Sequence, residues 1–273
     1  MEEKEESLNK VKTELKLRGF SEFTVRNYMW FIKKFIEKTS KPLEQINEDD
    51  AKTFLVEILD KKANSTTFLA FSSLKFLFSE VLKKPLILKL PKKEKKFPNV
   101  LTKEEFKTLV ENAETYKSRL IMLLLYSSGL RVSELVNLKR ADMNFNEKFG
   151  LVKQGKGKKD RFFQISDKIS EMLKQYFEKT PEHSFVFSKE KPLTPRNIQK
   201  IIKKAAFKAG IKKKVTPHTM RHSYATHLLD SGVDIRHIQT LLGHENLSTT
   251  QLYTHVSTEA LKKIKNPLDS FEF

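Results

Sequence analysis

The sequence predicts a mainly α protein with two domains: an N-terminal four-helix domain, and an α-rich domain that contains a small antiparallel β-sheet. Three observations predict this architecture. The chain has 273 residues, which is too many for one small core and suits two compact domains. Apolar residues recur at helical spacing along most of the chain. A lysine run between Pro91 and Pro98 interrupts that spacing and separates two helical blocks.

The first domain is expected to cover residues 1–90 and to contain four helices. Their expected ranges are 7–18, 22–38, 48–60 and 65–83. We expect Gly19 to close the first helix and Ser21 to cap the second. We expect Trp30, the only tryptophan, to serve packing rather than ligand binding. Apolar residues of the second helix recur near helical spacing, and they are Phe23, Tyr28, Phe31, Ile32, Phe35 and Ile36.

Residues 91–99 are expected to form a basic linker, because two prolines bracket the lysine run and helical periodicity stops there. The second domain then covers residues 100–273. Thr102 and Glu105 have the spacing of a capping box, which predicts a helix that ends near residue 113. Further helices are expected at about 117–128, 167–178, 195–209, 218–231 and 234–242.

Residues 141–166 are expected to form strands. The segments ADMNFNEKF, LVKQ and RFFQIS read as strands, and Gly-Lys-Gly-Lys-Lys-Asp at residues 155–160 separates the last two. A glycine-rich polar turn between two such segments is typical of a β-hairpin. This hairpin supplies the small antiparallel sheet of the second domain.

The charge of the chain indicates a polyanionic partner. Lys and Arg number 52 against 34 Asp and Glu, which gives a formal net charge of +18. The excess is not confined to one tail, since residues 1–97 carry +6 and residues 98–273 carry +12. Nucleic acid is the leading partner. An anionic membrane surface is a rival, but no long apolar span or polybasic amphipathic anchor is evident. A solvated lysine-rich surface of a heat-adapted protein is the third interpretation.

The chain contains no cysteine, which excludes disulfides, thiol catalysis and cysteine-ligated zinc. The N-terminal segment MEEKEESLNK is polar and lacks the apolar stretch of a secretory signal. We therefore expect a cytosolic protein.

Residues suited to phosphodiester chemistry are spread through the second domain. In-line attack on a phosphodiester places negative charge on its non-bridging oxygens, and arginine neutralises that charge through paired hydrogen bonds. Arg131 and Arg221 are the candidates. His218 precedes Arg221 by three positions, so on a helix the two side chains share one face.

A nucleophile and a proton donor complete this chemistry. Tyr253 supplies an oxygen nucleophile, and nearby cations or a base must overcome its ordinary pKa of about 10. The leaving alkoxide needs a proton, and Lys156 at the hairpin tip is the candidate donor. Spacing alone does not separate Lys156 from the other lysines of this turn, Lys153, Lys158 and Lys159. His244 is a candidate to bind the phosphate or to orient its neighbours.

Each of these residues also has a structural interpretation. Arg131 alone reads as a solvated charge on a surface helix. His218 and His222 have the spacing of a zinc pair, but the glutamate of an HExxH motif is missing and no third ligand is evident. We therefore expect no metal and no other cofactor. The remaining histidines and tyrosine of this region, His222, Tyr224, His227 and His255, are expected to be structural.

Together these residues resemble the tyrosine recombinase family, also called tyrosine integrases, and are similar to its Xer branch. The motifs that carry the resemblance are SSGLRVSEL at 127–135, KGKKDR at 156–161, and TPHTMRHSYATHLLDSGVDIRHIQTLLGHENLSTTQLYTH at 216–255. The family's order of catalytic residues is Arg, Lys, His-x-x-Arg, His or Trp, then Tyr. Every element is present in that order, as Arg131, Lys156, His218, Arg221, His244 and Tyr253.

The resemblance implies that residues 1–90 form a DNA core-binding domain and that residues 100–273 form a catalytic domain, which together clamp duplex DNA. Tyr253 is implied to form a 3′-phosphotyrosyl bond, and strands to be exchanged through a Holliday junction without ATP or metal. Glu134 is implied to orient an arginine or a histidine, although it also reads as a surface glutamate. The lysines expected to contact DNA are Lys92, Lys93, Lys95, Lys96, Lys158 and Lys159.

The resemblance also implies partners. Four copies are expected on synapsed double-stranded DNA, with each copy passing its C-terminal tail to a neighbour. A short helix at about 257–265, followed by a tail with apolar Leu268, Phe271 and Phe273, fits that exchange. A DNA translocase or another accessory protein is a possible further partner.

Several biological roles are open. Resolution of chromosome or plasmid dimers, and hence chromosome segregation, is the leading one, because no additional N-terminal arm-binding domain is evident. Integration of a mobile element is the alternative. Strand relaxation like that of a type IB topoisomerase, and DNA binding without catalysis, are the remaining two.

Overall fold

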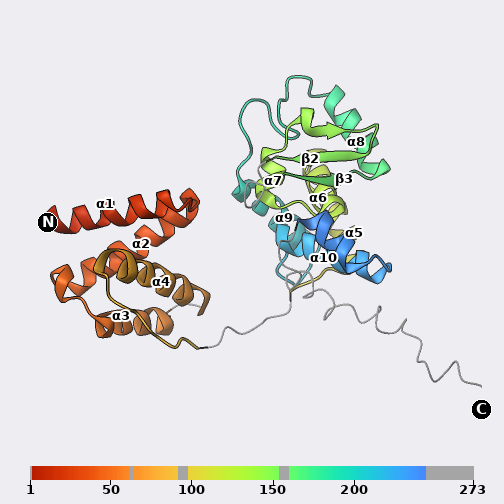
Figure 1. The fold of residues 1–273 in the computed structure, drawn as a ribbon. Helices are drawn as coiled ribbons and strands as arrows, with labels where there is room; N and C mark the ends of the chain where they lie inside the picture. Colours follow the sequence, from red (N-terminus) through yellow and green to blue (C-terminus); the bar gives the residue numbers. More distant parts are fainter. Residues whose placement is uncertain (1, 62–63, 92–97, 154–159, 244–273) are drawn as a thin grey trace, which may run out of the picture. The chain divides into compact units, whose positions relative to one another are not determined.

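The computed structural model describes residues 2–61, 64–91, 98–153 and 160–243. The chain divides into two compact units, Met1–Lys95 and Lys96–Phe273. Each unit is built mainly from helices, and a small antiparallel sheet belongs to the second (Figure 1), which confirms the predicted fold class. None of the helices in the described ranges is long and apolar enough to cross a membrane.

The first unit packs helices around one apolar core. α2 contacts α1 and α4, and α3 contacts α4. The aromatic ring of Phe35 lies inside this core, with its centre 5.3 Å from that of Phe54 and 6.3 Å from that of Phe78. The elements are α1 (Glu2–Leu17), α2 (Glu22–Thr39), the 3₁₀ turn η1 (Leu43–Gln45), α3 (Glu48–Lys61), α4 (Asn64–Leu77) and the π-helical turn η2 (Phe78–Leu82).

The helix boundaries that the sequence predicts between α1 and α2 are confirmed. Gly19 follows α1 with a φ of +70°, a conformation that glycine adopts without strain. The hydroxyl of Ser21 accepts the backbone N–H of Thr24 at 3.3 Å and so caps α2. α1 begins at Glu2 rather than near residue 7, because polar residues ahead of its apolar periodicity also join the helix.

Two aromatic residues of α2 lie outside the core. Phe23 is 64% exposed, so its predicted place on the buried face is wrong, and Trp30 is 56% exposed. The helical repeat explains this, because both lie about half a turn around the helix from the fully buried Ile32. Basic side chains cover the two rings instead. The guanidinium carbon of Arg26 lies 5.5 Å from the Phe23 ring centre, and Nζ of Lys34 lies 5.0 Å from that of Trp30.

The second unit is organised around a central helix, α6 (Tyr116–Ser128), which is buried along most of its length. α6 contacts α5 (Lys103–Glu111), α8 (Asp167–Glu178), α9 (Pro195–Lys208) and α10 (Pro217–Asp230). α11 (Ile235–Leu242) packs against α10 through a cluster formed by Tyr224, Ala225, Ile238 and Leu242. This packing brings the end of α11 next to the end of α6.

The capping box predicted for α5 is confirmed. The backbone N–H of Thr102 donates to Oε2 of Glu105 at 2.8 Å, and the N–H of Glu105 donates to Oγ1 of Thr102 at 3.1 Å. A short helix that the sequence does not predict, α7 (Val132–Asn137), follows α6 closely.

The three strands form an antiparallel sheet in the order β1 (Met143–Asn144), β2 (Phe149–Val152), β3 (Arg161–Gln164). Val152 pairs with Arg161, so residues 153–160 join β2 to β3, as the predicted hairpin requires. The strand predicted over ADMNFNEKF is wrong in extent. A 3₁₀ turn, η3 (Arg140–Asp142), precedes β1, and a turn with Lys148 at a φ of +55° reverses the chain before β2.

Gly150→Ala should destabilise the second unit. Gly150 pairs with Phe163, and a Cβ at this glycine would lie 2.2 Å from an atom of the fully buried Phe163 ring. Overpacking of a core typically costs about 1–3 kcal/mol, so the urea midpoint and the Tm should fall. Phe162→Ala is the matched control, because that ring is 66% exposed and its loss should matter little. An unchanged unfolding midpoint for Gly150→Ala would contradict this packing.

Candidate active site

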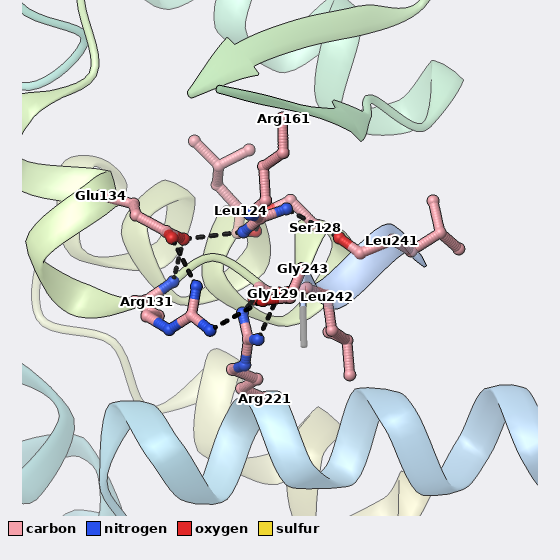
Figure 2. Close-up of polar contacts among 10 residues, drawn as sticks. All are labelled: Leu124, Ser128, Gly129, Arg131, Glu134, Arg161, Arg221, Leu241, Leu242 and Gly243. Atoms are coloured by element: carbon pink, nitrogen blue, oxygen red, sulfur yellow. Dashed lines mark hydrogen bonds and ion pairs between the residues drawn. The ribbon is translucent and has the colours of Figure 1, made fainter. Parts of the chain in front are cut away.

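Three arginine side chains from separate elements meet at the C-terminal end of α11 (Figure 2). Arg131 precedes α7, Arg161 begins β3, and Arg221 lies within α10. Their guanidiniums donate to the successive backbone carbonyls of Leu241, Leu242 and Gly243. The last carbonyls of a helix lack partners within the helix and carry partial negative charge, so these cations satisfy and stabilise that end.

Arg131 is positioned by the tight turn between α6 and α7. α6 ends at Gly129, which has a φ of +58°, and a Cβ there would lie 2.5 Å from Leu242 and 2.9 Å from Tyr224. Glycine therefore allows the helices to approach this closely. Arg131 takes the N-cap position of α7, and its Nη2 donates to the carbonyl of Gly243 at 3.2 Å. Its side chain is 20% exposed, so it is not a solvated charge on a surface helix.

Arg221 is buried, with 3% of its surface exposed. It lies on α10, whose N-terminus is capped by the hydroxyl of Thr216, which accepts the N–H of Thr219 at 3.1 Å. Nη1 of Arg221 donates to the carbonyl of Gly129, and Nη2 donates to the carbonyl of Leu242 at 2.5 Å. One guanidinium therefore ties the end of α6 to the end of α11.

Glu134 holds two of the arginines. Its Oε1 accepts Nη1 of Arg131 at 2.8 Å, and its Oε2 accepts the backbone N–H of Arg131 at 2.8 Å and Nη2 of Arg161 at 2.7 Å. Burial acts to raise the pKa of Glu134, but the charge and hydrogen bond of Arg161, followed by the bonds from Arg131, lower that pKa overall. With 4% of its side chain exposed, Glu134 is not a surface glutamate, and its described partners are arginines.

Arg161 is the residue of this cluster that the sequence analysis does not identify. Its Nη1 donates to the carbonyl of Leu241 at 2.7 Å, and 11% of its side chain is exposed. The signal lies in the alternation of β3, because Arg161 and the fully buried Phe163 are two residues apart and share one face of the strand. A charge on a buried strand face requires a partner, and Glu134 is that partner.

His218 lies one turn before Arg221 on the same face of α10. Partial desolvation, followed by the charges of Arg221 and Arg131, lowers the pKa of His218. The centre of the His222 ring lies 6.4 Å from that of His218, and burial, followed by the neighbouring His218 and Arg221, lowers the pKa of His222 to about 4. The imidazole of His218 is therefore neutral near pH 7, and it is available for hydrogen bonding beside two guanidiniums.

No set of three or more His, Cys, Asp or Glu side chains in the described ranges could hold a metal ion. The structure therefore gives the His218 and His222 pair no third ligand among the residues that it describes.

Three of the six predicted catalytic residues, Arg131, His218 and Arg221, are brought to one place. The other three, Lys156, His244 and Tyr253, lie outside the described residues. The predicted C-terminal helix and tail, 257–273, also lie outside them, and so do the predicted DNA contacts Lys92, Lys93, Lys95, Lys96, Lys158 and Lys159. Gly243, whose carbonyl Arg131 contacts, directly precedes His244 in the sequence.

Two tyrosines of the second unit, Tyr126 and Tyr224, lie in packed surroundings, with their ring centres 6.0 Å apart. Burial, and then the neighbouring Tyr224, raise the pKa of Tyr126 to about 12, and burial raises the pKa of Tyr224. The hydroxyl of Tyr126 is hydrogen-bonded to Nδ1 of His227 at 2.7 Å. A buried phenol with a raised pKa fits the structural role expected of Tyr224, and the hydrogen bond with Tyr126 fits the structural role expected of His227.

Known proteins resemble this chain over most of its length. Residues 99–260 match the Phage integrase family, and residues 8–88 match the phage integrase N-terminal SAM-like domain. Tyrosine recombinase XerA of Pyrococcus furiosus is 42% identical over 269 residues, which cover 94% of this chain and 92% of that protein. Tyrosine recombinase XerD of Staphylococcus aureus is 43% identical over 195 residues, which cover 66% of each chain.

Solved structures show the same fold. The crystal structure of XerA recombinase is 30% identical, with a TM-score of 0.57, and the match covers 96% of this chain and 97% of that one. XerH site-specific recombinase bound to palindromic difH substrate is 24% identical, with a TM-score of 0.75 over 90% of this chain and 80% of that chain. The sequence motifs, the arginine cluster and these matches lead to one conclusion: the chain belongs to the tyrosine recombinase (phage integrase) family, close to the Xer proteins, and is a site-specific DNA recombinase.

Proposed function

We propose that this recombinase cuts and rejoins DNA through a 3′-phosphotyrosyl intermediate, with Tyr253 as the nucleophile. Arg131, His218 and Arg221 bind the scissile phosphate. The observation that carries the proposal is that Glu134 and main-chain carbonyls hold the guanidiniums of Arg131 and Arg221, with His218 one turn before Arg221 on α10. A phosphate under in-line attack gains charge on its non-bridging oxygens, and cations that are already in position stabilise that charge without reorganising.

The proposed reaction consists of two transesterifications. The phenolate oxygen of Tyr253 attacks phosphorus and forms a bond on the 3′ side, while the bond to the 5′ oxygen breaks. Lys156 gives a proton to the departing 5′ oxygen. The 5′-hydroxyl of a partner strand then attacks the phosphotyrosyl bond and releases Tyr253. The covalent link conserves the energy of the broken bond, and paired exchanges form and resolve a Holliday junction.

The remaining predicted residues have supporting roles in this proposal. His244 follows the carbonyl that Arg131 holds, and we assign it a hydrogen bond to the phosphate. The net charge of +18 supports duplex DNA as the partner, and the lysines of the linker and of the hairpin tip neutralise its phosphates.

The biological role that we propose is resolution of chromosome or plasmid dimers in the cytoplasm, with integration of a mobile element as the alternative. The similarity to XerA and XerD recombinases supports the first role. In the proposed assembly four copies act on two synapsed sites, and each copy places its C-terminal tail on a neighbour. A translocase or accessory protein is a further proposed partner.

Tyr253→Phe should abolish covalent attachment to DNA while leaving DNA affinity nearly intact, because the change removes only the hydroxyl. The measurement is recovery of SDS-resistant adducts from nicked genomic fragments, followed by sequencing of the attached DNA, which also identifies the target site. Tyr126→Phe is the control and should form adducts normally. Adducts that persist in Tyr253→Phe would transfer the nucleophilic role to another tyrosine.

Lys156→Ala should cleave an ordinary phosphodiester slowly and a 5′-bridging phosphorothiolate at close to the wild-type rate. Sulfur leaves without a proton, so the general acid is no longer needed. Arg221→Ala is the matched control. Loss of a cation that stabilises the phosphate should cost about 3 kcal/mol, or about 100-fold in rate, on both substrates. If sulfur does not restore cleavage by Lys156→Ala, the proton donor is Lys158, Lys159 or a histidine.

Deletion of residues 268–273 should leave binding to a single site intact but impair synapsis and alter the balance between cleavage and religation. The apolar residues Leu268, Phe271 and Phe273 suit burial against a second copy. Gel-shift titration measures single-site binding, and the yield of two-site complexes measures synapsis. Asp269→Asn combined with Glu272→Gln is the control for loss of side-chain charge alone. Normal recombination by the truncated protein would show that the tail has no role in assembly.

A further inference from the structure

Arg161 links three elements of the second unit (Figure 2). It begins β3, donates from Nη2 to Glu134 of α7 at 2.7 Å, and donates from Nη1 to the carbonyl of Leu241 on α11 at 2.7 Å. Its aliphatic part lies against Gly243, where a Cβ would come within 2.6 Å of Cδ of Arg161. The side chain is therefore held at Nη1, at Nη2 and along its aliphatic part, while its buried Nε has no hydrogen-bond partner among the described residues.

Both contacts of Arg161 lead to residues of the proposed reaction. Glu134 accepts hydrogen bonds from the side chain and the backbone of Arg131. Leu241 and Gly243 belong to the main chain that runs directly into His244. Displacement of Arg161 would therefore disturb both the Glu134–Arg131 pair and the main chain at the end of α11.

We propose that Arg161 is a positioning residue for strand cleavage: through Glu134 it fixes the guanidinium of Arg131, and through the end of α11 it fixes the backbone that precedes His244. This inference rests on the function proposed above, because it concerns the same scissile phosphate. Arg161 acts through the groups that bind the phosphate.

The charge of Arg161 matters as well as its position. Glu134 accepts two hydrogen bonds from Arg131 as a carboxylate, yet burial opposes its ionisation by raising its pKa. Arg161 is the strongest influence in the opposite direction, and Arg131 follows. Arg221 of α10 binds nearby carbonyls, and the influences that lower the pKa of Glu134 most come from Arg161 and Arg131. Without Arg161 the pKa of Glu134 rises, and protonation at lower pH weakens its hold on Arg131.

Arg140 offers a matched comparison in the same unit. It also donates to backbone carbonyls, those of Thr180, Pro181 and Phe177 at 2.8, 3.2 and 3.3 Å, and its guanidinium carbon lies 4.3 Å from the Phe177 ring centre. These contacts hold the end of α8 and do not involve the arginine cluster. Loss of Arg140 therefore reports the effect of removing a carbonyl-binding arginine on stability alone.

The test measures single-turnover cleavage of a nicked duplex that carries the site identified from wild-type adducts, at pH values from 6 to 9, together with affinity and Tm. Arg161→Gln should cleave about 100-fold more slowly at neutral pH without a matching loss of affinity, because small misplacement of reacting groups has effects of this size. The ratio of its rate to the wild-type rate should rise with pH, because Glu134 regains its negative charge. The total rise should be up to tenfold for each unit by which the substitution has raised the pKa of Glu134.

Three further variants separate positioning from stability. Arg161→Lys keeps the positive charge but not the fork that reaches two acceptors, so it should cleave slowly with the pH dependence of wild type. Glu134→Gln combined with Arg161→Gln should lose the pH-dependent part of the defect, because the titrating carboxylate is gone. Arg140→Gln should lower the Tm while cleaving at the wild-type rate.

The outcomes are distinct. Wild-type cleavage by Arg161→Gln or Arg161→Lys, or a rate loss that parallels the loss of affinity at every pH, overturns the inference while the proposed function stands. If Arg161→Gln does not fold, Arg161→Lys decides by the same rate criterion. A wild-type protein that forms no phosphotyrosyl adduct overturns the proposed function, and the inference falls with it.

Discussion

The second unit depends on the burial of arginine charge at the point where α6 and α11 end. The guanidiniums of Arg131 and Arg161 contact the carboxylate of Glu134, and together with that of Arg221 they contact the carbonyls of Gly129, Leu241, Leu242 and Gly243. A buried ion costs several kcal/mol unless hydrogen bonds and opposite charge compensate it. The helix ends supply partial negative charge, and Glu134 supplies a full one.

Charge and packing are coupled in this arrangement because the same residues serve both. Leu242 buries its side chain completely in the cluster with Tyr224 and Ile238, while its carbonyl accepts a hydrogen bond from Arg221. A shift of α11 would therefore break apolar contacts and arginine contacts together. The geometry of the arginine cluster is thus a property of how the helices pack.

Patterns among residues close together in the sequence were sufficient to predict the helix caps and part of the candidate site. Ser21 and Thr102 cap helices because a hydroxyl at that position satisfies an N–H group nearby in the sequence. Arg131 and Arg221 could be named from motifs and chemistry. Their common partner at the end of α11 could not, because contacts between distant segments leave no local pattern. Lys156, His244 and Tyr253, which lie outside the described residues, remain predictions.

Arg161, α7 and the exposed position of Phe23 were not predicted from the sequence, and each has a physical reason. Arg161 follows a lysine-rich turn and looks like one more surface charge, although it shares a buried strand face with Phe163. α7 is too short for apolar periodicity to reveal it. Phe23 is apolar, but apolar residues also occupy exposed positions, so hydrophobicity alone did not identify its helix face.

Gly129 also bears on how such a protein evolves. At Gly210 and Gly232, which have open space around them, a substitution costs only backbone strain of about 1–2 kcal/mol. At Gly129 the same change also presses against Leu242 of α11 and Tyr224 of α10, so a substitution there is tolerated only if side chains of two other helices change or move as well.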